Sequence, residues 1–306
     1  MAMTGILRPA FMQIRVLDMP ASVEFYTKRI GFFQVTEGKD GRVYLKSQDE
    51  FDHHSLVLRR ADTAGLDVMC FKVKDDSDLD VFEKRVSEFG YKVDHVPAGE
   101  QPGLGRRIGW TTGTGHRIEL VAHSEMSDPH PMVNNPNVWV HEPRGMKARR
   151  LDHALLCGPK IEREAEFFTK VLGFSVTERV DAPNGPIAIW LTCGMKAHDV
   201  ALLEFPEPNK IHHMAFELEN WQSVGDAADI MTHYDISIDI GPTRHGITRG
   251  QTIYFFDPSG NRCEVFAGGY TYYPDNPTRL WDTDNIGRGI FYYERRLNEA
   301  FLKVYT

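Results

Sequence analysis

Two stretches of this chain are so alike that the sequence divides into two copies of one structural unit. Residues 22–32 read SVEFYTKRIGF and residues 164–174 read EAEFFTKVLGF, which places Gly31 and Gly173 in equivalent positions, 142 residues apart. Self-similarity over such a distance indicates a duplicated unit. A chain of 306 residues is long enough to bury two separate cores, so we expect two similar domains.

A second match near the end of each half includes a glutamate. Residues 115–120 read GHRIEL and residues 260–265 read GNRCEV. In the second half this stretch belongs to a predicted β-hairpin over residues 251–266, in which Asp-Pro-Ser-Gly supplies the turn. The hairpin's second strand carries Glu264 among apolar neighbours. A carboxylate there is costly unless a metal or a charged partner pairs with it, so Glu264 is the first indication of a site.

Each half divides again into two units, each of one strand, one helix and three strands. Apolar periodicity and glycine stops predict the four helices, at residues 21–29, 78–89, 161–172 and 221–232. The predicted fold class is α+β, with two similar domains that each consist of two βαβββ modules. Composition places the boundaries, with an N-terminal domain at 1–130, a linker at 131–147, a C-terminal domain at 148–270 and a tail at 271–306 that ends in a helix at 296–303.

Composition and charge exclude several classes of function. Lysine and arginine total 35 against 43 aspartates and glutamates, and this net charge of −8 argues against a nucleic-acid or anionic-membrane partner. No apolar run reaches the roughly 18 residues of a membrane span, and the first residues lack the features of a signal peptide. The four scattered cysteines are expected to be free thiols of a cytoplasmic protein.

The second half carries histidines at strand positions where the first half has none. His153 opens the first strand of the third module and His213 opens that of the fourth, whereas the first half has Phe11 and Val68 there. The glutamate is present in both halves. Two histidines and one carboxylate on separate strands, Glu264 being the third, form the facial triad of non-haem metal enzymes. The second half can therefore build a three-ligand site, and the first half cannot.

The sequence leaves the identity of the metal open and places several other histidines away from the three ligands. A mixed nitrogen and oxygen set accepts Fe(II), Mn(II) or Zn(II). Alternation places His213 on one face of its strand and the adjacent His212 on the opposite face, which we expect to pack on a helix. Six histidines of the first half and the linker are expected at the solvent surface, namely His53, His54, His116, His123, His130 and His141.

Three more residues of the second half invite chemical roles. His198 and His245 could act as acid or base, because histidine titrates near neutrality. Tyr254 could donate a hydrogen bond to an anionic oxygen. It shares a sheet face with Glu264 only if the hairpin loop has an odd number of residues, such as 257–261, and the register cannot be read from the sequence.

Several longer motifs resemble a known family over essentially the whole chain. They are RVLDM at 15–19, GRVYLK at 41–46, KAHDVA at 196–201, IDIGPTRHG at 238–246 and the hairpin at 251–266. In these motifs the chain is similar to the type I extradiol ring-cleavage dioxygenases of the vicinal oxygen chelate superfamily, whose fold is also called glyoxalase-like. The resemblance implies cleavage of catechol and small alkylcatechols by O₂ beside the diol, giving 2-hydroxymuconate semialdehyde-type products in the degradation of aromatic compounds.

The resemblance also implies roles for particular residues. It assigns a single Fe(II) to His153, His213 and Glu264, and acid, base and O₂-pocket roles to His198, His245 and Tyr254. It assigns the substrate pocket to five further residues, namely Trp190, Ile247, Thr248, Ile290 and Phe301. The last two lie in the tail, which would fold back over the mouth of the active site. The family implies a homotetramer.

Two other functions are compatible with the same fold. A Zn(II) or Ni(II) isomerase of the glyoxalase type would carry a further metal-binding glutamate, for which Phe11 and Val68 leave no equivalent. A metal-free protein that sequesters small molecules would not need the triad together with His198, His245 and Tyr254. The dioxygenase is therefore the leading hypothesis.

Overall fold

The computed structural model describes residues 5–138 and 142–306. The first half contains, in chain order, β1 (Ile6–Val16), α1 (Met19–Glu24), the π-helical turn η1 (Phe25–Ile30), β2 (Phe33–Glu37), β3 (Val43–Lys46), β4 (Leu56–Arg60), β5 (Gly65–Val73), α2 (Asp76–Phe89), β6 (Asp94–Val96), β7 (Arg107–Thr111) and β8 (Arg117–Val121). The second half contains β9 (Arg150–Gly158), α3 (Ile161–Lys170), β10 (Ser175–Ala182), β11 (Gly185–Thr192), β12 (Val200–Glu204), β13 (Lys210–Glu217), α4 (Trp221–His233), β14 (Ile238–Arg244), β15 (Gly250–Phe256), β16 (Arg262–Gly268), β17 (Arg279–Asp282), α5 (Ile286–Ile290) and the 3₁₀ turn η2 (Phe301–Lys303).

The order of the strands confirms the predicted modules. The first sheet runs β2-β3-β4-β1-β5-β8-β7-β6, so the first strands of its two βαβββ modules, β1 and β5, lie side by side at its centre. The second sheet runs β14-β15-β16-β13-β9-β12-β11-β10-β17, with β13 and β9 at the equivalent place. The fold is therefore α+β with two βαβββ modules in each half, as predicted, and β17 of the tail extends the second sheet.

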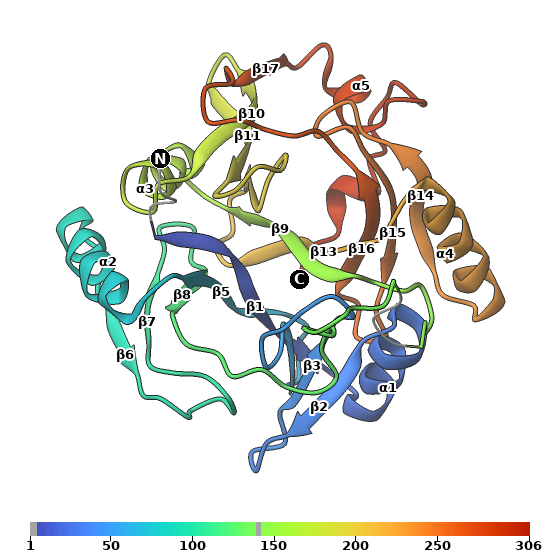
Figure 1. Ribbon diagram of the computed structural model, residues 1–306. Helices are drawn as coiled ribbons and strands as arrows, with labels where there is room; N and C mark the ends of the chain where they lie inside the picture. The colour runs from blue at the N-terminus through green and yellow to red at the C-terminus, as the bar shows by residue number, and fades with distance from the viewer. Residues whose placement is uncertain (1–4, 139–141) are drawn as a thin grey trace.

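The helices cover the outside of the two sheets (Figure 1). One face of each sheet packs with the helices in a continuous apolar core that spans both halves. Aromatic side chains connect the halves, since Phe167 of α3 packs on Trp110 and Phe168 on Phe71. The opposite faces form separate clusters, one in the first half and two in the second. The side chains on the inner face of the second sheet are therefore separate from the main apolar core.

The hairpin predicted over residues 251–266 forms in the second half. Asp257 accepts hydrogen bonds from the backbone N–H groups of Ser259 and Asn261, each at 2.8 Å. The loop between β15 and β16 holds five residues, 257–261, and Tyr254 pairs directly with Glu264 across the two strands. This odd loop length brings both side chains to the same face of the sheet, as the sequence allowed.

Two β-bulges interrupt the antiparallel ladder between β9 and β13. In each bulge one extra residue has no partner on the other strand; these residues are Asp152 on β9 and His212 on β13. The first half has bulges at the equivalent places of β1 and β5, with Ala10 and Asp67 as the extra residues. A bulge breaks the alternation of side chains, so a residue there can turn to the same side as its neighbour.

The tail departs from the predicted helix at 296–303. Only the short turn η2 forms there, and α5 lies earlier in the tail. The carbonyl groups of Phe301 and Val304 accept hydrogen bonds from the guanidinium group of Arg262, which anchors this segment to β16. A long-range contact of this kind overrides local helix preference.

The prediction that the first-half histidines lie at the surface is wrong for three of them. His53, His54 and His116 are buried. Nε2 of His116 donates a hydrogen bond to the Lys210 carbonyl of the other half, and its Nδ1 is hydrogen-bonded with the Thr114 hydroxyl. Contacts between distant parts of the chain explain this burial. His141 lies outside the described residues.

Two other features agree with the sequence predictions. The four cysteines are free thiols. No helix in the described part of the chain is long and apolar enough to cross a membrane. We propose that the two domains meet in residues 131–147, whose described part carries no helix or strand.

Candidate metal centre

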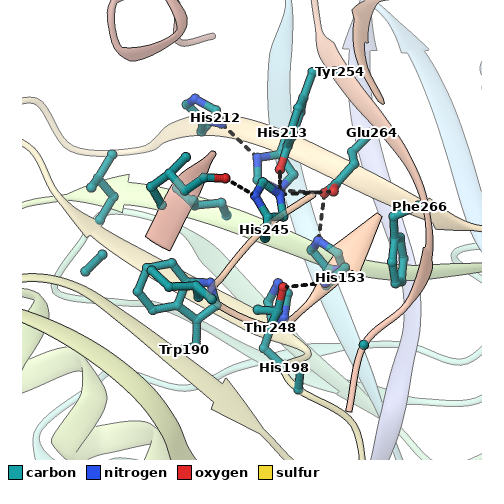
Figure 2. Close-up of a pocket in the computed structure, with 18 of the residues that line it drawn as sticks. His153, Trp190, His198, His212, His213, His245, Thr248, Tyr254, Glu264 and Phe266 are labelled. Carbon is teal, nitrogen blue, oxygen red and sulfur yellow. Dashed lines mark hydrogen bonds and ion pairs between the residues drawn. The ribbon is translucent and has the colours of Figure 1, made fainter. Parts of the chain in front are cut away.

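Three potential metal ligands meet on the inner face of the second sheet. His153 comes from β9, His213 from β13 and Glu264 from β16, three neighbouring strands of the sheet. Nε2 of His153 lies 3.0 Å from Oε2 of Glu264, and Nε2 of His213 lies 3.2 Å from the same oxygen. One donor atom from each residue lies within 4.8 Å of the other two, and all three residues are buried. Figure 2 shows the three side chains converging.

Burial and hydrogen bonding set the charges of this cluster. Burial alone would raise the pKa of Glu264, but hydrogen bonds with His153 and His213 outweigh it and hold that pKa well below its usual range. Burial lowers the pKa of His213 to about 4. The cluster therefore combines an ionised carboxylate with a neutral imidazole, the forms in which both groups bind a metal.

The chemistry of the donors fits a divalent cation. A buried carboxylate needs a positive partner. Burial would lower the pKa of His153, but hydrogen bonds to Asp152 and Glu264 raise it, so this imidazole can hold a proton that neutralises Glu264. A divalent cation between the three donors would take the place of that proton. Two imidazoles and one carboxylate leave open positions for other ligands, as in non-haem iron enzymes.

The bulge residue Asp152 orients the first of the two histidines. Oδ2 of Asp152 accepts a hydrogen bond from Nδ1 of His153 at 2.8 Å. Nζ of Lys196 lies 2.8 Å from the other carboxylate oxygen of Asp152 and 3.0 Å from Asp199. A carboxylate that holds the distal nitrogen of a ligating histidine fixes its tautomer and its ring orientation.

His212 occupies a different place from the one predicted. It was expected to pack on a helix, but it lines the inner cavity, where its ring packs on Phe301 with centroids 4.5 Å apart. Its Nδ1 lies 2.7 Å from Nδ1 of His213. The bulge at His212 is the physical reason, since it cancels the alternation on which the prediction rested.

Three further polar side chains surround the ligands. The ring of His198, from the loop between β11 and β12, lies 4.0 Å from that of His153. Nε2 of His245 lies 2.8 Å from the hydroxyl of Tyr254. Nδ1 of His245 contacts the Ile290 carbonyl, which can only accept, so Nδ1 carries the hydrogen and Nε2 accepts from Tyr254. Burial raises the pKa of Tyr254 well above its usual range and lowers that of His198 well below.

A cavity of about 420 Å³ opens beside the ligands. Its walls are mostly apolar, which is typical of small-molecule sites. All five residues predicted for the substrate pocket line it, namely Trp190, Ile247, Thr248, Ile290 and Phe301. The tail contributes Ile290 and Phe301, so it does fold back over the inner face of the second sheet.

A buried carboxylate that the sequence did not single out supports the far wall of the cavity. Glu178 of β10 accepts hydrogen bonds from the backbone N–H of Thr248 and from the indole of Trp281, both at 2.7 Å. Thr248 has a left-handed backbone with φ 60°, a conformation that needs such support in a residue with a side chain. Because these contacts join residues far apart in sequence, no local pattern could have revealed Glu178.

The first half replaces the metal centre with an ion pair. The counterpart of Glu264 in the first half is Glu119. It pairs with Cys70 of β5, as Glu264 pairs with Ala215 of β13. Nε of Arg107 lies 2.8 Å from Glu119, and both side chains are buried. Arg107 stands at the ladder position that Thr252 holds in the second half, where the Thr252 hydroxyl donates to Glu264.

Known proteins resemble the chain along its whole length. Residues 150–265 match the family model described as the Glyoxalase/Bleomycin resistance protein/Dioxygenase superfamily, and residues 66–125 match the Catechol 2,3-dioxygenase-like N-terminal domain. A metapyrocatechase of Pseudomonas sp. (strain CF600) is 44% identical over 99% of both chains. A manganese-dependent 2,3-dihydroxybiphenyl 1,2-dioxygenase of Geobacillus genomosp. 3 is 28% identical over 90% of both chains.

A solved structure agrees with these relatives. The 2,3-dioxygenase LapB from Pseudomonas sp. KL28 superposes with a TM-score of 0.90 at 43% identity, covering 93% of this chain and 100% of that one. The match includes both halves, and the two-histidine, one-carboxylate cluster lies in the half that matches the superfamily model. The chain therefore belongs to the catechol 2,3-dioxygenase (metapyrocatechase) family of extradiol dioxygenases, within the glyoxalase-like superfamily.

Proposed function

We propose that this protein cleaves catechol and small alkylcatechols with O₂ beside the diol, at a single Fe(II) held by His153, His213 and Glu264. The observation that carries the proposal is the convergence of these three donors at one wall of an apolar cavity. Family membership supports the reaction class, and the open positions beside the triad would accommodate a diol and O₂. When bound, the iron would hold both substrates and carry the electrons between them.

The chain's own residues supply proton transfer. Nε2 of His245 accepts from the Tyr254 hydroxyl, so this pair can take up a phenolic proton from the diol and then donate a hydrogen bond to the resulting oxygen. His198 stands on the other side of the ligands, and its low pKa makes it a neutral imidazole that can accept a proton and return it during ring opening. We propose these roles for His198, His245 and Tyr254.

The cavity walls would select the substrate. Trp190, Ile247 and Phe301 are buried apolar side chains, and the partly buried Ile290 lies between them. Such walls favour a ring with hydrogen or a short alkyl substituent, since a charged substituent would lose its hydration there. We propose that Thr248 fixes the edge of this pocket through its bond to Glu178.

The test uses metal-free protein loaded with Fe(II) without air. After catechol is added and air admitted, a yellow ring-fission product and matching oxygen uptake are expected. Mn(II)-loaded protein is the parallel sample, because a related enzyme depends on manganese. If only the Mn(II)-loaded protein turned over catechol, the metal of the proposal would be manganese and not iron. Catechol binding without oxygen uptake in either sample would contradict ring cleavage and favour sequestration.

Two further proposals concern the whole molecule. We propose a homotetramer, which the family resemblance implies, and sedimentation of the purified protein would test it. We propose a cytoplasmic location because the four cysteines are free thiols, which persist in a reducing compartment.

A further inference from the structure

His212 contacts both the ligand His213 and the tail residue Phe301, and none of the residue roles described above explains these contacts. It is the extra residue of the bulge in β13, next to the ligand His213, and it is buried. Its first-half counterpart, Asp67, forms ion pairs with Arg15 and Arg59 instead. The bulge is thus common to both halves, whereas a histidine at this place occurs in the half with the metal ligands.

The contacts of His212 fix where its hydrogen lies. Nε2 of His212 lies 3.1 Å from the carbonyl oxygen of Phe301, which can only accept, so this nitrogen carries the hydrogen. In a neutral ring Nδ1 is then an acceptor, and the hydrogen of its 2.7 Å contact comes from Nδ1 of His213. Nε2 of His213 keeps its lone pair and points to Glu264, which is the state required of a metal ligand.

The terminal segment, residues 300–306, is held by residues adjacent to His212. The backbone of Thr306 pairs with that of Ile211, with N–H to O distances of 2.8 and 3.1 Å. Arg262 donates to the carbonyl oxygens of Val304 and Phe301 at 2.8 and 3.1 Å. The Phe301 carbonyl therefore receives hydrogen bonds from both Arg262 and His212. Figure 1 places the C-terminus near β13 at the centre of the molecule.

The side chain of the same Phe301 forms part of the cavity wall. Its ring packs on Tyr254 and Phe291 with centroids 4.8 and 5.1 Å apart. Its backbone thus holds His212 while its ring closes the cavity. In Figure 2 the ring of His212 lies on the side of His213 away from the Glu264 carboxylate.

We propose that His212 is a positioning residue that links the metal ligand His213 to the terminal segment, so that metal binding and docking of this segment stabilise each other. Such coupling is reciprocal between two binding events. The other ligand, His153, is oriented by Asp152, a fixed carboxylate of its own strand. The His213 side of the centre therefore depends on the docking of the terminal segment, and the His153 side does not. The inference rests on the site binding a divalent metal, and it does not depend on the substrate.

The first experiment measures the release of Fe(II) to a coloured chelator without air. In His212→Gln the amide nitrogen can still reach the Phe301 carbonyl, but the acceptor for Nδ1 of His213 is lost. In His212→Phe both contacts are lost. Removing such a partner typically costs 10- to 100-fold in metal affinity, so both variants should release iron about 10 to 100 times faster than the unmodified protein.

His53→Asn is the matched control, because Nδ1 of His53 makes the same kind of contact with Nδ1 of His54, at 3.0 Å and in the other half. It should release iron at the unmodified rate. Circular dichroism of each metal-free variant checks the fold, and His212→Gln carries the test if His212→Phe does not fold. Release from both His212 variants at the control rate would overturn the proposal.

The second experiment measures hydrogen exchange of a peptide that covers residues 300–306. Metal loading should slow exchange of this peptide severalfold in the unmodified protein and in His53→Asn. In His212→Phe the peptide should exchange at one rate with and without metal. Equal slowing in all three proteins would show that the terminal segment responds to metal by another route, and the proposed link would then be wrong.

Discussion

The imidazole rings of His153 and His198 lie with their centroids 4.0 Å apart at an interplanar angle of 47°. His198 therefore stands beside the metal centre without forming part of its ligand set. Replacement by phenylalanine keeps a ring of similar size and removes the proton-carrying nitrogens. His198→Phe should retain its metal and turn over catechol at least about a hundredfold more slowly, the usual effect of losing an acid–base group. Metal analysis and kcat check this; loss of metal as well would make His198 a structural support.

Removal of a metal ligand, unlike replacement of His198, should cost the protein its metal. His213→Ala leaves Glu264 and His153 as a pair and should lose the metal and all activity, while the fold is kept. Metal content after dialysis and circular dichroism test this. His233→Ala, an exposed histidine at the end of α4, is the control and should keep the metal. Full activity of His213→Ala would contradict the ligand assignment.

Lys196 neutralises two buried carboxylates behind the metal centre. Its ammonium lies 2.8 Å from Asp152 and 3.0 Å from Asp199. Lys196→Met leaves both acids without this cation, and we expect a loss of about 3 kcal/mol in the free energy of unfolding, at the lower end for a buried pair because the lysine is partly exposed. Urea unfolding measures it. Lys170→Met, which removes an exposed pair with Glu166, should leave the unfolding free energy unchanged within error.

The stability of the protein should depend on pH through Glu164 of α3. Burial raises the pKa of Glu164 to about 7, although hydrogen bonds from Tyr91 and Gly113 oppose the shift. The unfolded chain ionises this group at its ordinary, lower pKa, so the folded state binds more protons between the two values. Stability is therefore complete below the ordinary carboxyl pKa and falls as pH rises to about 7.

Glu164→Gln should abolish this dependence. Relative to the unmodified protein, the variant should gain roughly 3 kcal/mol between pH 4 and pH 8, since one pKa unit corresponds to about 1.4 kcal/mol. Unfolding in urea across this range gives the difference. Glu162→Gln, at an exposed position of the same helix, should follow the unmodified curve. A flat difference for Glu164→Gln would refute the assignment.

Trp190 should limit the size of the ring substituent. Its indole is a buried wall of the cavity, next to Ile247. Trp190→Phe enlarges the pocket at this wall, so the ratio of kcat/KM for a 4-alkylcatechol to that for catechol should rise about tenfold, as expected for space for one or two carbon atoms. An unchanged ratio would place the substituent elsewhere in the cavity.

Short patterns predicted the parts of the site that local chemistry determines. The repeat revealed which half carries the histidines, because Phe11 and Val68 stand where His153 and His213 stand. The ladder confirms both equivalences. Turn chemistry predicted the hairpin, whereas the structure was needed to show its five-residue loop at 257–261 and the shared face of Tyr254 and Glu264.

Long-range contacts account for what the sequence did not reveal. Alternation put His212 on the wrong face because a bulge leaves no local signature in the residues that form it. The tail does not form the expected helix at 296–303, and Arg262 anchors it instead through the carbonyl groups of Phe301 and Val304. Glu178 could not be identified, since its partners Thr248 and Trp281 are far away in the chain.

The buried pair of Arg107 and Glu119 shows what duplication can do with an inherited carboxylate. Both halves kept the glutamate, and each needs a positive charge beside it. One half obtains that charge from its own chain, so it cannot be lost to a chelator or to oxidation. The other half takes it from a proton on His153 until a divalent cation replaces that proton. Starvation for metal would therefore leave the first half unchanged, while the second half would exchange its metal for a proton.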